Sequence, residues 1–129
     1  MTATELWILP VPSTALLGSG AVFEIRSKRD VAIRFAYEAK DDSRLEEALV
    51  FHGVEAFKCI YYLARGEFAR KAYDKLVDCG RTAWLDEISE NLRRNAGSPE
   101  GLLHLMINFD DGPAYEFLCR SYSVERKHE

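Results

Sequence analysis

The sequence predicts an α+β fold, in which an antiparallel sheet of about five to six strands carries two consecutive helices packed on one face. Apolar and polar residues alternate with a period of two in the first third of the chain and again near its end. Between these regions the apolar period is 3.6, as in helices, and Gly80 interrupts it. Strands grouped before and after a helical pair are typical of this fold class.

The 129 residues are expected to form a single domain spanning residues 1–129, since a chain of this length can bury one hydrophobic core. Apolar residues make up 47% and charged residues 29% of the chain, close to the average for soluble globular proteins. The net charge is −4, and the basic residues are interleaved with acidic ones. Nucleic-acid binding is therefore not expected, because it needs a clustered basic surface.

The chain is expected to be cytoplasmic. Its first 25 residues contain Glu5, Pro10 and Pro12 and lack the basic start of a signal peptide. No apolar run of about 18 residues occurs, so no membrane segment is expected. The three cysteines are an odd number, widely spaced and without a C-x-x-C pair, which indicates reduced thiols rather than disulfides or a metal site.

The first strands are predicted within residues 6–37. Leu6–Leu9 is expected to be an edge strand, because Pro10 and Pro12 follow it and proline cannot donate to a central ladder. Residues 13–20 are expected to form a loop. Alternation on both sides of Ser27–Asp30 then predicts an antiparallel hairpin with one buried face. The charged stretch Lys40–Glu47 is predicted to be a turn.

Residues Leu49–Leu63 are rich in aromatic and branched side chains, and the alternation changes phase at Gly53. This pattern predicts a long strand with a bulge at that glycine, and a helix is the alternative.

Two helices follow. The first is predicted from Glu67 to Cys79, with Gly80 at the position of a left-handed C-cap. Thr82 can cap the second, whose acidic residues lie in the first turns and which ends near Asn95.

A closing hairpin is predicted around a three-residue loop, Asp110–Gly112. A two-residue turn would mix the two faces, whereas the longer loop keeps the apolar residues on one face. The resulting pairs are Ile107 with Tyr115, Leu105 with Phe117, and Leu103 with Cys119. Residues from Val124 to Glu129 are expected to be frayed.

The first candidate site lies on this hairpin. In the predicted register His104 lies diagonally from both Glu116 and Arg120, on the face opposite the helices, and a carboxylate contact would orient its ring as in an acid–base pair. The alternative is that these residues are only the wet side of a two-sided sheet. Asp110 and Asp111 are candidates as well, but a turn explains them better than metal ligation, because a calcium loop needs several more oxygen ligands.

A second candidate site consists of His52, Glu55 and Lys58, which surround the expected bulge. Bulges often re-aim side chains near active sites, although this one could simply bend the strand. No nucleophile elbow, P-loop, zinc-protease or dinucleotide motif is present. We therefore assign no catalytic residue and expect no metal or cofactor, and whether the protein is an enzyme stays open.

The stretches "WLDEI" and "GLLHLMINFDDGPAYEFLCRSY" resemble small single-domain bacterial proteins of an "FDDGPxYEF" type that are uncharacterised. The resemblance covers Val54 to Tyr122. It implies a bacterial, cytoplasmic protein and transfers no catalytic residue. The position of Ala114 is often cysteine in those proteins, and the alanine here argues against a thiol function at that position.

The leading functional hypothesis is a non-enzymatic protein-binding module, immunity-like or regulatory, that docks a protein partner on an open sheet face or an edge strand. It rests on the missing catalytic motifs and on polar residues interleaved with Met106, Leu118 and Tyr122. The alternative is a small-molecule-binding protein or enzyme with a pocket near His104 and Glu116. A third hypothesis is a homodimer that pairs the second sheet faces.

Overall fold

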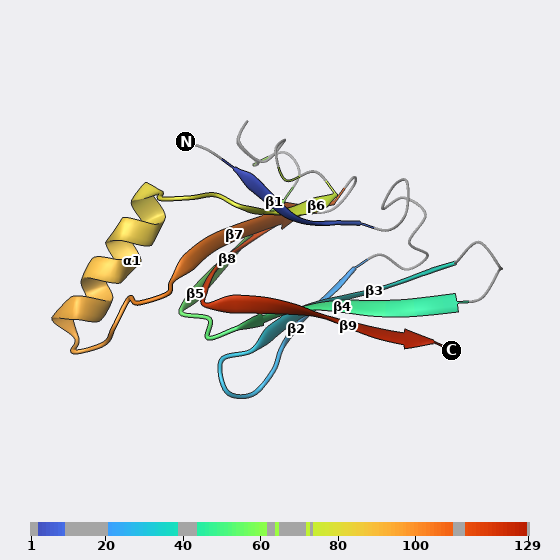
Figure 1. Ribbon diagram of the computed structural model, residues 1–129, viewed down its shortest axis with the longest axis horizontal. Helices are drawn as coiled ribbons and strands as arrows, with labels where there is room; N and C mark the ends of the chain where they lie inside the picture. The colour runs from blue at the N-terminus through green and yellow to red at the C-terminus, as the bar shows by residue number, and fades with distance from the viewer. Residues whose placement is uncertain are drawn as a thin grey trace.

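Strands dominate the computed structural model, which describes residues 3–9, 21–38, 44–61, 64, 72, 74–109 and 113–128 (Figure 1). Nine strands and one helix lie within these residues. In chain order they are β1 (Thr4–Ile8), β2 (Val22–Ile25), β3 (Val31–Glu38), β4 (Arg44–His52), β5 (Ala56–Ile60), β6 (Lys75–Asp78), α1 (Ala83–Arg94), β7 (Leu103–Asn108), β8 (Ala114–Cys119) and β9 (Ser121–His128).

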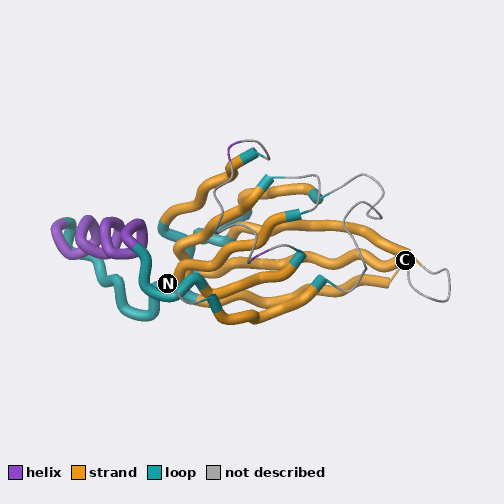
Figure 2. The backbone as a smooth tube through the Cα atoms, turned by 90° about the horizontal axis from the view of Figure 1, so that it is seen from above, coloured by secondary structure: helices purple, strands orange, loops and turns teal. Residues whose placement is uncertain are grey.

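The strands form two antiparallel sheets that pack face to face as a sandwich. The larger sheet has the order β1-β6-β7-β8-β5, and the smaller has the order β2-β3-β4-β9. Helix α1 covers neither inner face; it projects beyond the strands at one end of the molecule (Figures 1 and 2). The predicted α+β fold is therefore wrong, because a second sheet covers the apolar face that was assigned to two helices.

The hydrophobic core lies between the two sheets. Phe51 of β4 stacks on Phe117 of β8 with ring centroids 3.9 Å apart, which joins the sheets at their centre. Both rings are fully buried, as are Ile33, Leu49, Leu105 and Ile107 around them. This alternation of inward apolar residues on both sheets is the pattern of a β-sandwich.

Several local predictions are confirmed. β1 is an edge strand, and β2 pairs with β3 as an antiparallel hairpin. The register of β7 and β8 is the one predicted, with Leu103 opposite Cys119, Leu105 opposite Phe117 and Ile107 opposite Tyr115. The loop 110–112 itself lies outside the described residues.

The prediction of one long strand across residues 49–63 is wrong, and so is its helical alternative. β4 ends at His52, and the chain crosses to the other sheet, where it continues as β5. Gly53 makes this crossing with a positive φ of 62°, and a Cβ on it would lie 3.2 Å from Cδ of Arg120. The change of phase in the sequence marks a change of sheet rather than a bulge.

The first predicted helix is also corrected. Its last part, Lys75–Asp78, is strand β6, which lies between β1 and β7. Of its earlier part only Ala72 and Asp74 lie within the described residues, and Ala72 is buried. Gly80 does have a positive φ, of 72°, but it follows a strand rather than a helix.

Two further boundaries differ from the predictions. The expected turn at Lys40–Glu47 is strand from Arg44 onward, and its first part lies outside the described residues. The expected frayed tail is β9, which pairs with β4 along its whole length up to His128. The loop expected at 13–20 lies outside the described residues.

Helix α1 begins where the sequence predicts. The Thr82 hydroxyl accepts the backbone N–H of Leu85 at 3.3 Å and caps the helix, while Asp86 and the pair Arg93 and Arg94 lie at the ends that suit the helix dipole. Within the described residues, no helix is long and apolar enough to cross a membrane.

Candidate functional site

The first predicted pair meets on the outer face of the larger sheet. His104 Nε2 lies 2.8 Å from Glu116 Oε1, so the predicted diagonal contact is present. On the other side of the ring, His104 Nδ1 lies 2.7 Å from the hydroxyl of Thr82. The His104 and Glu116 side chains are only 6% and 9% exposed, which shows that the expectation of a wet sheet face is wrong.

Trp84 and Lys58 cover this pair. The Trp84 ring meets the imidazole edge-on, with centroids 5.2 Å apart. Lys58 lies opposite Glu116 in the β5–β8 ladder, and its ammonium group sits 4.0 Å above the centre of the Trp84 ring. We call these five residues, Thr82, Trp84, His104, Glu116 and Lys58, the helix-root cluster, because they fix the start of α1 to the sheet.

The hydrogen bonds of the cluster form a chain that runs from the first turn of α1 to Glu116. The Thr82 oxygen accepts the Leu85 N–H, so its own O–H can donate to His104 Nδ1, and the ring then donates Nε2–H to Glu116. Neither cavity described below is lined by His104 or Glu116. The cluster therefore has the geometry of an anchor for α1, and no described cavity brings a substrate to its ring.

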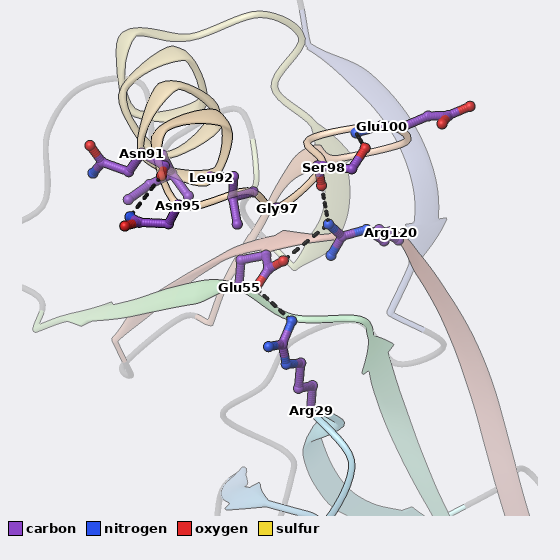
Figure 3. Close-up of a pocket in the computed structure, with 10 residues that line it drawn as sticks. Arg29, Glu55, Asn91, Leu92, Asn95, Gly97, Ser98, Glu100 and Arg120 are labelled. Atoms are coloured by element: carbon purple, nitrogen blue, oxygen red, sulfur yellow. Dashed lines mark hydrogen bonds and ion pairs between the residues drawn. The ribbon is translucent and has the colours of Figure 1, made fainter.

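A cavity of about 650 Å³ lies beneath α1, between the helix, the 97–100 loop and the start of β5 (Figure 3). At its floor, Glu55 binds Arg29 through Oε1 at 2.9 Å and Arg120 through Oε2 at 3.0 Å. Arg120 also donates to the carbonyl oxygens of Gly53 and Ser98, at 2.9 and 2.8 Å. Arg120 therefore ties the 97–100 loop, which leads from α1 back to the larger sheet, to the sandwich.

The upper wall of this cavity comes from the last turns of α1. Leu92 points into the gap between the helix and Gly97, whereas Glu100 points away from Arg120 (Figure 3). Asn91 and Asn95 add amide groups beside them. Two guanidinium groups and two carboxylates balance within the lining, which suits a small polar ligand without net charge.

The structure regroups the two predicted sites. Lys58 joins His104 and Glu116, whereas Glu55 joins Arg120. His52 belongs to neither: its ring nitrogens contact Asp30 at 3.2 Å and Ser123 at 2.8 Å. Asp110 and Asp111 lie outside the described residues. Among the described residues, no group of three or more histidine, cysteine, aspartate or glutamate side chains could hold a metal ion.

The outer face of the smaller sheet carries an ion network around a second cavity of about 350 Å³. Arg26 binds Glu24 at 2.6 Å and Glu125 at 3.2 Å, and Arg34 binds Glu24 and Glu46. The hydrogen bond from Arg26 lowers the pKa of the Glu24 carboxyl. Because these charges pair with one another above small buried residues, the network serves as a polar cover for the sheet.

One open edge of the sandwich exposes apolar side chains, and the sequence reasoning missed it. Edge strands β2 and β5 lie side by side there, with the Phe23 and Phe57 rings 5.2 Å apart. Ile25, Phe57 and Tyr61 are 69%, 42% and 74% exposed. We call this surface the β2/β5 edge. Its sequence signal was the apolar alternation after Gly53, which cannot by itself distinguish an edge from a core strand.

The opposite edge of the sandwich is closed differently. There the Tyr122 hydroxyl of β9 donates to the Leu6 carbonyl of β1 at 3.0 Å, which links the two sheets.

Comparison of the chain with protein-family models, with curated proteins and with solved structures found no match. The function is therefore argued from the geometry of the chain itself.

Proposed function

We propose that the protein is a non-enzymatic protein-binding module whose partner docks on the β2/β5 edge. The observation that carries the proposal is the exposure of Ile25 and Phe57 on two adjacent edge strands and of Tyr61 directly after β5. An edge strand offers unpaired backbone N–H and C=O groups, and tyrosine and phenylalanine supply much of the contact energy at interfaces. A strand from a partner could bond the free edge through its backbone and pack its side chains on the exposed apolar groups.

The polar candidate residues support this assignment because they bind one another within the chain. His104 and Glu116 are buried against Trp84, and Glu55 and Arg120 bind each other. Their contacts hold α1 and the 97–100 loop on the sandwich, so they have a structural role that does not require a catalytic one. Of the two docking surfaces that the sequence hypothesis named, an open sheet face and an edge strand, the proposal keeps the edge strand, and the immunity-like or regulatory class stays a hypothesis.

The proposal is tested by changing one exposed residue on each edge of the sandwich. The variant Tyr61→Glu alters the β2/β5 edge, and Ile8→Glu is the matched control, because Ile8 of β1 is 64% exposed on the opposite edge. Each tagged protein is incubated with a lysate of its native cell, and co-purified polypeptides are quantified by mass spectrometry after circular dichroism has confirmed folding.

We expect a stoichiometric partner with the wild type and with Ile8→Glu, and at least a tenfold loss with Tyr61→Glu, since a buried unpaired charge costs several kcal/mol. Equal recovery with all three proteins would contradict the proposal.

A second candidate function is small-molecule binding in the cavity beneath α1. Its volume of about 650 Å³ favours this reading, because ligand sites of roughly 300–1,000 Å³ are common. The test is a thermal-shift screen of small polar metabolites, repeated with Arg29→Gln, which removes an exposed cation from the lining. A ligand that stabilises the wild type but not the variant would support the cavity, and a screen without any stabilising compound would count against it.

A further inference from the structure

The four edge strands of the described residues differ in how they resist pairing with another strand. Natural proteins protect free edges with bulges, proline, charged side chains or very short strands. β1 has a bulge between Glu5 and Trp7 and is followed in sequence by Pro10. β9 carries the consecutive charged residues Glu125 and Arg126. β2 has only four residues, one of which is Glu24.

β5 has none of these protections. Its five residues, AFKCI, include no proline and pair with β8 in a continuous register. Its one charged side chain, Lys58, holds its ammonium over the Trp84 ring, on the outer face and away from the edge. Phe57 and Cys59 alternate onto the other face and are exposed, and so is Tyr61, which directly follows the strand. Among the edge strands of the described residues, β5 is therefore the least protected against pairing with a strand from another chain.

The sequence of β5 is complementary to itself. In an antiparallel pair with a two-fold axis at Cys59, Phe57 of each copy lies opposite Tyr61 of the other. Two aromatic cross-strand pairs then form, each worth roughly 0.5–1 kcal/mol. Lys58 lies opposite Ile60, so no like charges face each other across the pair. A two-fold axis of this kind is the commonest symmetry of homodimers.

The apolar area also matches a weak dimer. A fully exposed aromatic side chain offers roughly 150–250 Å², so Tyr61 and Phe57 at their exposures of 74% and 42% contribute roughly 230 Å² per copy. Two copies together therefore bring roughly 460 Å² of aromatic surface, to which the paired backbones add, and this is less than the roughly 1,200–2,000 Å² of a stable interface. The association should therefore depend on protein concentration.

We propose that the partner on the β2/β5 edge is a second copy of this chain, which pairs β5 with β5 around Cys59 and extends the larger sheet across the dimer. This inference rests on the proposed function and specifies its partner. It differs from a dimer through the sheet faces, because the outer face of the larger sheet buries its polar pair within one chain.

The test combines sedimentation with thiol cross-linking of the purified full chain. Sedimentation velocity over a wide concentration range should show a monomer–dimer equilibrium. Directly opposed residues in an antiparallel pair have Cα atoms about 4.5–5.5 Å apart, within the range of a disulfide. Diamide should therefore oxidise two Cys59 thiols to a disulfide. The diamide takes up the two protons and two electrons of the thiols and becomes the hydrazine. Cys79 and Cys119 are fully buried and should not react.

Three variants identify the interface. Cys59→Ser should remove the cross-link and leave the sedimentation equilibrium unchanged. Cys59→Glu places two carboxylates opposite each other and should raise the dimer Kd at least tenfold. Ile8→Glu, on the other edge, should change neither measurement.

A dimer that persists in Cys59→Glu would overturn the inference. A wild type that sediments as a monomer at every concentration would overturn it as well. In that case the comparison of Tyr61→Glu with Ile8→Glu in the lysate still decides whether the edge binds a different protein, so the two proposals fail separately.

Discussion

Replacing Thr82 with alanine tests the role of the helix-root cluster. The hydroxyl of Thr82 does two things: it caps α1 through the Leu85 N–H, and it satisfies Nδ1 of the buried His104. Loss of an N-cap costs about 1 kcal/mol, and leaving a buried ring nitrogen without a partner costs about 1–3 kcal/mol. Because Thr82 is itself only half-buried, water can partly replace it. We therefore expect Thr82→Ala to lower the free energy of unfolding by about 2–3 kcal/mol.

The assay is urea denaturation followed by circular dichroism, with thermal unfolding as a second measurement. A domain of this size loses roughly 3–5 °C in Tm for each kcal/mol, so the Tm should fall by roughly 6–15 °C. Thr82→Ser is the matched control, because serine keeps the hydroxyl and should cost less than about 1 kcal/mol. The reasoning is refuted if the alanine variant loses less than about 1 kcal/mol, or if serine costs as much as alanine.

Three other changes give measurable effects on stability. Gly53→Ala should lower the free energy of unfolding by about 2 kcal/mol in urea, because φ of 62° is strained for alanine, and a loss below about 0.5 kcal/mol would contradict this. Arg126→Met leaves the fully buried Glu47 carboxylate without its ion pair and should cost about 3 kcal/mol, whereas adding Glu47→Leu should recover most of the loss; no recovery in the double variant would be inconsistent with this account. Burial raises the pKa of the Cys79 and Cys119 thiols from 9.0 to about 12, so the unfolded chain loses these protons first and the free energy of unfolding should fall as pH rises from about 9 to about 12. Alanine at both cysteines should flatten that slope in urea titrations, and an unchanged slope would argue against the thiols as its source.

Local patterns predicted the parts of the fold that depend on neighbouring residues. The register of β7 and β8 followed from keeping Leu105, Ile107 and their partners on one face, because a shift of one residue would move them all to the other face. The same register placed His104 diagonally from Glu116. Thr82 was identifiable as a cap because its side chain acts within one turn of helix.

The parts that failed depend on distant residues. The phase change at Gly53 is equally compatible with a bulge and with a crossing between sheets, and only the second sheet distinguishes them. Lys75–Asp78 is too short to separate a period of two from one of 3.6, and its pairing with β1 and β7, from both ends of the chain, makes it a strand. Non-local pairing overrode the helical pattern there.

The candidate sites were regrouped for the same reason. Glu55 and Lys58 are three residues apart, but the first lies in the crossing turn and faces Arg120, while the second lies in β5 and faces Trp84. Sequence spacing could place each residue on a face only after the sheet was known. The contact between Lys58 and Trp84 depends on the position of the first turn of α1 relative to the sheet. No sequence pattern within the helix indicates that position.

In this chain a polar pair is buried and large apolar side chains are exposed, which is the reverse of the usual distribution and bears on function. A histidine–glutamate pair is buried on the outer face of the larger sheet, where the histidine also bonds Thr82, the N-cap of α1. Phe57 of β5 and Tyr61, which follows the strand, instead remain exposed beside the least protected edge strand of the described residues. Such an edge promotes aggregation unless something covers it. The contacts of the polar pair are all within one chain, whereas we propose that a partner strand covers the exposed edge, and binding should be tested there.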